Sequence, residues 1–277
     1  MTRTVLITGC SDGGIGSALT KRFAASGFKV FATARSVSKM SALNAVPNIT
    51  LLELNVRSVE SMTAALKAVS VETGGRLDYL VNNAGVAYRT AALEAEDRIA
   101  RELFDVNFWG IVDMCRIFGP PVIKAKGTIV NISSLSGIGV PMLWNSIYSA
   151  SKAAVDAYSN TLRLELSPFD VRVVTVVPGA VETNMNSSHV LAPSTLPAGD
   201  SLFKPAEKHI AKANIPDRMS VDLFAEKVVA DVLGGATGRV WRGAFTSCVW
   251  AIMTFCPRAV LDKLVTQNQG LELLGKK

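Results

Sequence analysis

Residues 131–152 read NISSLSGIGVPMLWNSIYSASK and place two serines, a tyrosine and a lysine around the end of one predicted strand. The run Thr128–Ile132 overlaps the start of this stretch, is short and is rich in β-branched residues, which predicts a buried parallel strand. Ser133 and Ser134 therefore fall at a carboxyl strand end, where open parallel sheets bind their ligands. The stretch predicts a ligand site and an α/β fold built around it.

Tyr148 and Lys152 are four residues apart, so a helix would put both side chains on one face. A neighbouring cation favours the phenolate and should lower the pKa of a phenol from its usual value of about 10. Tyr148 can then protonate a carbonyl oxygen that Ser134 holds, while Lys152 also reaches a cofactor ribose. The Tyr-x-x-x-Lys spacing alone arises by chance in on the order of one chain in five, and a serine pair is often only a turn or a cap.

The composition predicts one α/β domain, because 277 residues at 49% hydrophobic and 19% charged can bury a large core. The formal net charge of +6 is spread along the chain without a long Lys/Arg block. This pattern argues against nucleic-acid binding and fits anionic cofactors or substrates, and it leaves peripheral contact with an anionic membrane open.

The four cysteines, Cys10, Cys115, Cys248 and Cys256, form neither a CxxC pair nor a metal-ligand spacing. We therefore expect reduced thiols, no metal and a cytoplasmic location, either free or at the surface of a lipid or endoplasmic-reticulum membrane. The first predicted strand starts within four residues of the N-terminus, which leaves no room for a signal peptide.

That first strand, Thr4–Thr8, runs into the glycine-rich sequence GCSDGGIG and then into an apolar-periodic helix that reaches Phe23. Glycines let the main chain approach a pyrophosphate, and a helix N-terminus supplies free N–H groups. The spacing differs from G-x-G-x-x-G, and a purely structural turn is the alternative. The predicted cofactor contacts are Gly9, Ser11, Asp12, Gly14, Ile15 and Gly16.

A second strand is predicted at Phe28–Ala34, and Arg35 and Ser36 follow it. An acidic side chain in this place would bind a ribose hydroxyl of NAD, whereas an arginine accommodates the 2′-phosphate of NADP. We therefore expect NADP(H) as the cofactor, with both residues in contact with it. A solvated arginine at a strand end is the alternative.

Two more strands are predicted at Ile49–Leu54 and Leu77–Val81, with a helix at Ser58–Glu72 between them. Each strand ends in small or amide side chains, which can line a cofactor without crowding it. These candidates are Asn55 and Val56 beside the adenine, then Asn82, Asn83, Ala84 and Gly85.

A longer helix is predicted over Asp97–Phe118, and it carries Asn107 in a largely apolar run. A buried amide needs hydrogen-bond partners, which a neighbouring helix can also supply. Beyond the tyrosine helix, a helix at Val221–Leu233 and a short strand at Gly238–Trp241 are predicted.

Taken in order over residues 4–183, these motifs resemble the short-chain dehydrogenase/reductase family. The resemblance implies a doubly wound Rossmann-type sheet and an oxidoreductase that uses NADP(H). It implies that Ser134, Tyr148 and Lys152 are catalytic. Asn107 would hold a water that links the lysine to solvent. The nicotinamide-side motif of the family matches Pro178, Gly179, Val181 and Thr183.

Three departures from the family pattern affect particular positions. The glycine loop has one residue more than is usual in the family, which leaves its path open. Asn55 stands where the family has Asp, and its amide oxygen can still meet an adenine amino group. The interval from serine to tyrosine is also one residue longer, so Ser134 is assigned as catalytic with Ser133 and Ser136 as substitutes.

The C-terminal part resembles the fungal branch of the family related to NADPH-dependent 1-acyldihydroxyacetone-phosphate reductase, through the sequence RVWRG at 239–243, Pro257-Arg258 and Gly270-Leu271. This resemblance implies a lipophilic carbonyl substrate from lipid or fungal secondary metabolism. We expect a single domain with a cofactor and catalytic core at 1–183, a substrate lid at 184–220 and a C-terminal substrate or interface segment at 221–277. His189 and His209 in the lid are expected at the surface rather than at the substrate.

Residues 243–256 carry no formal charge but are too few to span a bilayer. They can form a core or subunit-interface helix, a wall of the substrate pocket, or a segment in a membrane interface. Aromatic and aliphatic side chains favour the pocket wall. These residues are Trp241, Phe245, Trp250, Ile252 and Phe255.

The predicted function is hydride transfer between NADPH and a bulky lipophilic ketone, or the reverse oxidation of the alcohol. Two alternatives are an NADP(H)-binding sensor or scaffold without turnover, and a cyclase or isomerase on the same fold. Intact Tyr148 and Lys152 argue against loss of the chemistry. We also expect a homo-oligomer, either a dimer or a tetramer.

Overall fold

The computed structural model describes residues 2–183, 197, 199–211 and 217–275. Within these residues the chain forms one parallel sheet of seven strands in the order β3-β2-β1-β4-β5-β6-β7. This order confirms the predicted doubly wound sheet. The strands are β1 (Thr4–Thr8), β2 (Lys29–Ala34), β3 (Ile49–Glu53), β4 (Tyr79–Asn82), β5 (Thr128–Ile132), β6 (Arg172–Pro178) and β7 (Gly238–Arg242).

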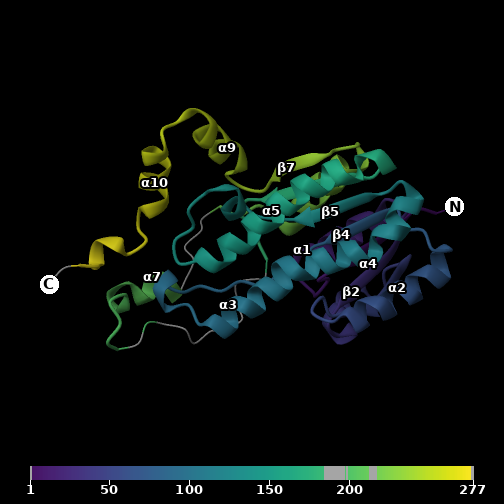
Figure 1. Cartoon of the computed structure of the whole chain (residues 1–277), viewed down its shortest axis with the longest axis horizontal. Coiled ribbons are helices and arrows are strands. Elements are labelled where there is room, and N and C mark those ends of the chain that lie inside the picture. Colours follow the sequence, from purple (N-terminus) through teal and green to yellow (C-terminus); the bar gives the residue numbers. More distant parts are fainter. Residues whose placement is uncertain (1, 184–196, 198, 212–216, 276–277) are drawn as a thin grey trace.

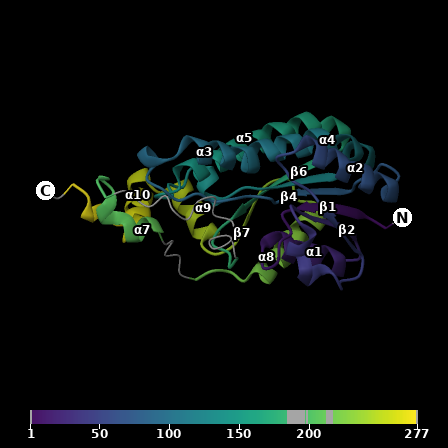
Figure 2. The same cartoon turned by 90° about the horizontal axis from the view of Figure 1, so that it is seen from below.

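Both faces of the sheet are covered by helices, so successive residues of a strand enter two different cores. In β1, Val5 and Ile7 face one core and Leu6 faces the other. Figure 2 shows the two helical layers on either side of the sheet. The first layer contains α1 (Ile15–Ala25) and α8 (Val221–Leu233), and the second contains α2 (Val59–Thr73), α4 (Gly110–Ala125) and α5 (Ser146–Leu166).

The prediction of one continuous α-helix over residues 97–118 is wrong at residues 105–109. The chain forms α3 (Asp97–Phe104), then a π-helical turn, η3 (Asp105–Trp109), and then α4. The side chain of Asn107 lies in this turn and pairs with the main chain of Val86 on a neighbouring segment. A π turn inserts one residue into a helix, often where a functional side chain must be aimed.

The strands run toward the end of the molecule at which α7 (Glu207–Ala211), α9 (Thr246–Phe255) and α10 (Arg258–Thr266) gather, away from the N-terminus (Figure 1). Of the predicted lid at 184–220, the structure describes residues 197, 199–211 and 217–220, and His189 lies outside the described residues. His209 lies on α7 with its Nδ1 3.1 Å from the carbonyl oxygen of Asn268. No helix in the described part of the chain is long and apolar enough to cross a membrane.

Candidate active site

A cavity of about 680 Å³ lies at the carboxyl ends of the strands. Its lining includes residues that follow five strands and one that ends a sixth, so the whole central sheet contributes to one site. These residues are Gly9 after β1, Arg35 after β2, Asn55 after β3, Asn83 after β4, Ser133 after β5, and Pro178 at the end of β6.

The glycine-rich loop passes the segment that follows β4 at a distance that only glycine permits. Gly9 has a φ of +74°, and a methyl group added there would lie 2.8 Å from Cα of Ala84. A methyl group added at Gly16 would lie 2.4 Å from the carbonyl oxygen of Gly9. Helix α1 begins after Gly14, and no side chain caps its N-terminus. Its first N–H groups therefore lie beside the cavity, as a phosphate-binding turn requires.

Asp12 ties the glycine loop to the neighbouring 3-10 helix η1 (Val37–Leu43). The Asp12 carboxylate accepts hydrogen bonds from Ser41 Oγ (2.7 Å) and from the N–H of Ala42 (3.1 Å). The Asp12 N–H donates to the carbonyl oxygen of Lys39 (2.8 Å). These bonds give Asp12 an anchoring role; it does not line the cavity, and its contact with the cofactor stays a prediction.

Arg35 and Lys39 both line the cavity beyond the end of β2. The sequence analysis included Arg35 and missed Lys39, which enters the site because η1 is tied to the glycine loop. The described residues that line the cavity include no aspartate or glutamate. The adenosine end is therefore suited to a phosphate rather than to an unsubstituted ribose.

The catalytic candidates lie on two adjacent elements, the segment after β5 and helix α5. Ser136 donates its hydroxyl to Ser134 Oγ (3.0 Å), which leaves the Ser134 hydroxyl proton to be donated toward Tyr148. Ser133 instead donates to the carbonyl oxygen of Lys152 (3.2 Å), so it is used in packing α5 against the strand. This geometry favours Ser134 over the two substitutes.

The expected effect of Lys152 on Tyr148 is wrong for this structure. Burial raises the pKa of the Tyr148 phenol, and the opposing influence comes from the Ser134 hydroxyl rather than from the lysine. The Lys152 Nζ lies 5.9 Å from the centre of the tyrosine ring and donates to the carbonyl oxygen of Ile132 (2.8 Å). Burial lowers the pKa of Lys152 to about 8. At neutral pH the pair is therefore a neutral phenol beside an ammonium group.

Asn107 lies next to this pair but does not line the cavity. Its Oδ1 accepts from the Val86 N–H (2.8 Å), and its Nδ2 donates to the Val86 carbonyl oxygen (3.0 Å) and to Ser151 Oγ (3.2 Å). A methyl group added at Gly85 would lie 3.4 Å from Asn107 Oδ1 and 3.6 Å from Lys152 Nζ. Asn107 is thus a positioning residue that joins the loop after β4 to α5, and the water that it is expected to hold stays a prediction.

Three more predicted cofactor contacts lie outside the cavity lining. Gly16 provides close packing of α1 against the glycine loop. Ser36 shares a hydrogen bond of 2.8 Å with Ser38, and Asn82 donates to Asn131 Oδ1 (2.8 Å) inside the sheet. The other predicted contacts all line the cavity. They are Gly9, Ser11, Gly14, Ile15, Arg35, Asn55, Val56, Asn83, Ala84, Gly85, Tyr148, Lys152, Pro178, Gly179, Val181 and Thr183, together with catalytic Ser134.

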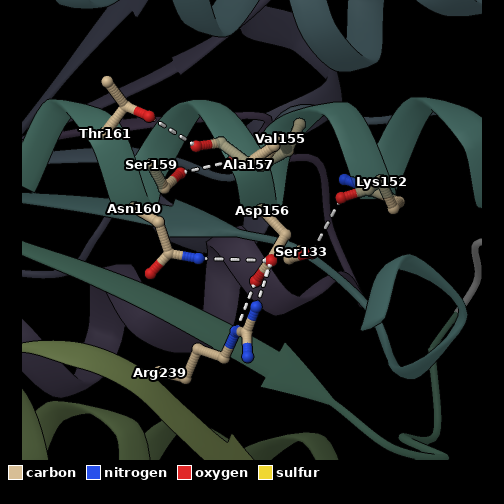
Figure 3. Close-up of polar contacts among 9 residues, drawn as sticks. All are labelled: Ser133, Lys152, Val155, Asp156, Ala157, Ser159, Asn160, Thr161 and Arg239. Carbon is tan, nitrogen blue, oxygen red and sulfur yellow. Dashed lines mark hydrogen bonds and ion pairs between the residues drawn. The ribbon is translucent and has the colours of Figure 1, made fainter. Parts of the chain in front are cut away.

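Helix α5 is fastened to the edge of the sheet by an ion pair (Figure 3). Asp156, one turn beyond Lys152, accepts from Arg239 Nε (2.8 Å) and Nη2 (2.6 Å), and also from Asn160 Nδ2 (3.3 Å). The Arg242 guanidinium is paired with Asp231 (2.6 Å). Both arginines of the RVWRG sequence therefore stabilise the fold around the site.

Several apolar side chains line the cavity. Phe245 and Val249 of the C-terminal segment are among them, which supports the pocket-wall prediction for residues 243–256. The other four predicted wall residues, among them Trp250 and Phe255, do not line the cavity, and these two rings pack against each other at the surface. The sequence analysis missed the remaining apolar lining, which includes Val140, Met142, Ile210 and Val265.

Comparisons with known proteins show which family the chain is similar to. The family model described as short chain dehydrogenase matches residues 3–192. A short-chain dehydrogenase of Penicillium ochrochloron is 43% identical over 97% of this chain and 98% of its own. The NADPH-dependent 1-acyldihydroxyacetone phosphate reductase of Schizosaccharomyces pombe is 39% identical over 89% of this chain and 84% of its own. A solved short chain dehydrogenase from Burkholderia cenocepacia in complex with NADP has a TM-score of 0.76 at 25% identity and covers 96% of this chain and 98% of that chain. The chain therefore belongs to the short-chain dehydrogenase/reductase family.

Proposed function

We propose that the protein is an NADPH-dependent carbonyl reductase that acts on bulky lipophilic ketones. The observation that carries the proposal is the convergence of Ser134, Tyr148 and Lys152 on one cavity, which has a phosphate-binding turn at one end and apolar walls at the other. An intact acid group beside a cofactor cavity supports turnover over a purely sensing role.

The cavity fits NADP(H) on structural grounds. The uncapped N-terminus of α1 and the close approach of Gly9 to Ala84 suit a pyrophosphate. Arg35 and Lys39 suit a 2′-phosphate, and no described lining residue would repel it. The cofactor is NADP(H), as it is in the solved Burkholderia complex and in the NADPH-dependent fungal relative.

The bound cofactor supplies the hydride that reduces the carbonyl carbon. Ser134 donates a hydrogen bond to the carbonyl oxygen and so holds it beside Tyr148. Because burial raises the pKa of Tyr148, the phenol keeps its proton at neutral pH and can donate it to that oxygen. Solvent then returns a proton to the phenolate that is left, and the Lys152 ammonium group, 5.9 Å from the centre of that ring, remains available to a cofactor ribose.

The test is the oxidation of NADPH by the purified protein with ketones graded in size and polarity. Tyr148→Phe should lower kcat by roughly 10²–10⁴-fold, because it removes one positioned acid and keeps the ring. NADPH binding, followed by fluorescence titration, should remain close to that of the wild type. A variant that keeps the wild-type kcat would remove this mechanism.

A further inference from the structure

The proposed cofactor accounts for only part of the positive charge in the cavity. Six basic side chains line it, and none of the described lining residues is acidic. One of them, Arg57, has carboxylate partners at its outer edge, Glu102 (3.5 Å) and Asp105 (3.8 Å). The six are Arg35, Lys39, Arg57, Arg89, Lys152 and Arg218.

Arg89 lies at the substrate end of the cavity, beyond the loop that follows β4. Its Nε donates to the carbonyl oxygen of Ile210 and its Nη2 to that of His209, both at 2.9 Å, at the C-terminal end of α7. The N–H of the next residue, Thr90, donates to the carbonyl oxygen of Trp144 (2.9 Å), which holds Arg89 beside the segment that leads into α5. The guanidinium is therefore bonded to α7, while the adjoining main chain is bonded to the segment that precedes α5.

The partners of Arg89 are neutral, although its charge is partly removed from water. Burial lowers the pKa of its guanidinium, and no ion pair to Arg89 occurs within the described part of the chain. A partly desolvated charge is costly unless an opposite charge accompanies it. Three of its five N–H groups remain for such a partner, because two are used on α7.

Arg76 makes the same kind of hydrogen bond to the C-terminal end of a helix, although it does not lie in the cavity. Its Nη1 donates to the carbonyl oxygen of Lys124 (2.8 Å) at the C-terminal end of α4, and the side chain is exposed on the surface. An arginine that only caps a helix can therefore stay in water. Arg89 instead lines the cavity together with Ile210, to which it is bonded, and this placement calls for a second role.

We propose that Arg89 binds an anionic group, a carboxylate or a phosphate, on a substrate whose remaining part is apolar. This inference rests on the proposed carbonyl reductase function and specifies its substrate class. The apolar walls around Ile210, Met142 and Phe245 would hold the hydrocarbon part, and the arginine would fix the orientation of the molecule through a charge-assisted bond. The keto group would then meet Ser134 and Tyr148 in a defined register.

The test uses a set of matched ketones and the full-length protein with NADPH. Three long-chain methyl ketones differ only at the far end, which is a carboxylate, a phosphate monoester or the methyl ester of the same keto acid. The wild type should prefer one charged ketone over the ester by about tenfold or more in kcat/KM. Arg89→Gln should lose roughly ten- to a hundredfold more on that ketone than on the ester, mainly through KM, because the loss of its two bonds to α7 affects both substrates alike. Arg89→Lys should recover part of the loss, and Arg76→Gln should behave as the wild type.

The relative rates on the carboxylate and the phosphate identify which anion the site takes. Equal kcat/KM of the wild type on charged and ester ketones would overturn the proposal, and so would an equal loss on both in Arg89→Gln, because a lid-anchoring role affects every substrate. If Arg218→Gln abolishes the preference and Arg89→Gln does not, the assignment to Arg89 is wrong. Continued turnover of the ester in any of these cases would leave the carbonyl reductase function standing.

Discussion

Replacement of Lys152 by methionine should remove a rise of stability with pH in the alkaline range. The Lys152 side chain is only 3% exposed, and burial lowers its pKa from 10.5 to about 8. Between these two values the unfolded chain binds a proton that the folded chain lacks, so the free energy of unfolding increases as the pH rises. A gap of about 2.5 units corresponds to about 3 kcal/mol at roughly 1.4 kcal/mol per unit.

Other buried groups act in the opposite direction over the same range. Burial raises the pKa of the Tyr148 phenol and raises that of the Cys115 thiol to about 12, so these groups lower the free energy of unfolding as the pH rises. The variant keeps both groups, and the difference between the two proteins therefore isolates the lysine. The loss of the bond to the Ile132 carbonyl oxygen adds an offset that does not depend on this titration.

The measurement is urea unfolding followed by circular dichroism for both proteins at several values between about pH 7 and pH 11. The free energy of unfolding of the wild type, minus that of Lys152→Met, should increase by about 3 kcal/mol across the window. If the free energies of unfolding of the two proteins changed in parallel with pH, burial would not have lowered the pKa of Lys152. That result would refute the reasoning above.

Three further predictions follow from the site. Arg35→Asp should erase or reverse a preference for NADPH over NADH of at least about tenfold, as compared by kcat/KM for both cofactors. Arg239→Leu should cost about 2–3 kcal/mol in urea unfolding because it leaves the buried Asp156 carboxylate unpaired, and the double replacement with Asp156→Leu should cost less than the single one. Phe245→Ala should reduce the kcat/KM preference for large over small ketones roughly tenfold, whereas Trp250→Ala, at the surface, should not.

The central strands and the catalytic helix could be predicted because their signals are local. The run Thr128–Ile132 is β-branched at every position except Asn131 because both faces of that strand are covered, and β5 has these bounds. The spacing of Tyr148 and Lys152 is sufficient to put them on one face of α5. The π turn at Asn107 could not be found in this way, because its apolar pattern is that of an ordinary helix and its cause is a bond to Val86, which lies 21 residues away in the sequence.

The positions of the charged residues around the cavity could not be predicted from the local sequence either. Asp12 lies within the glycine motif and was expected at the cofactor, but its carboxylate is taken by Ser41, which is 29 residues further along the chain. That bond fixes η1 against the loop and thereby brings Lys39 to the cavity. Arg89 likewise faces the substrate end because α7 folds back over it. The specificity that we propose for phosphate and for substrate therefore depends on basic residues whose local sequence is unremarkable and whose position is decided by contacts between distant segments.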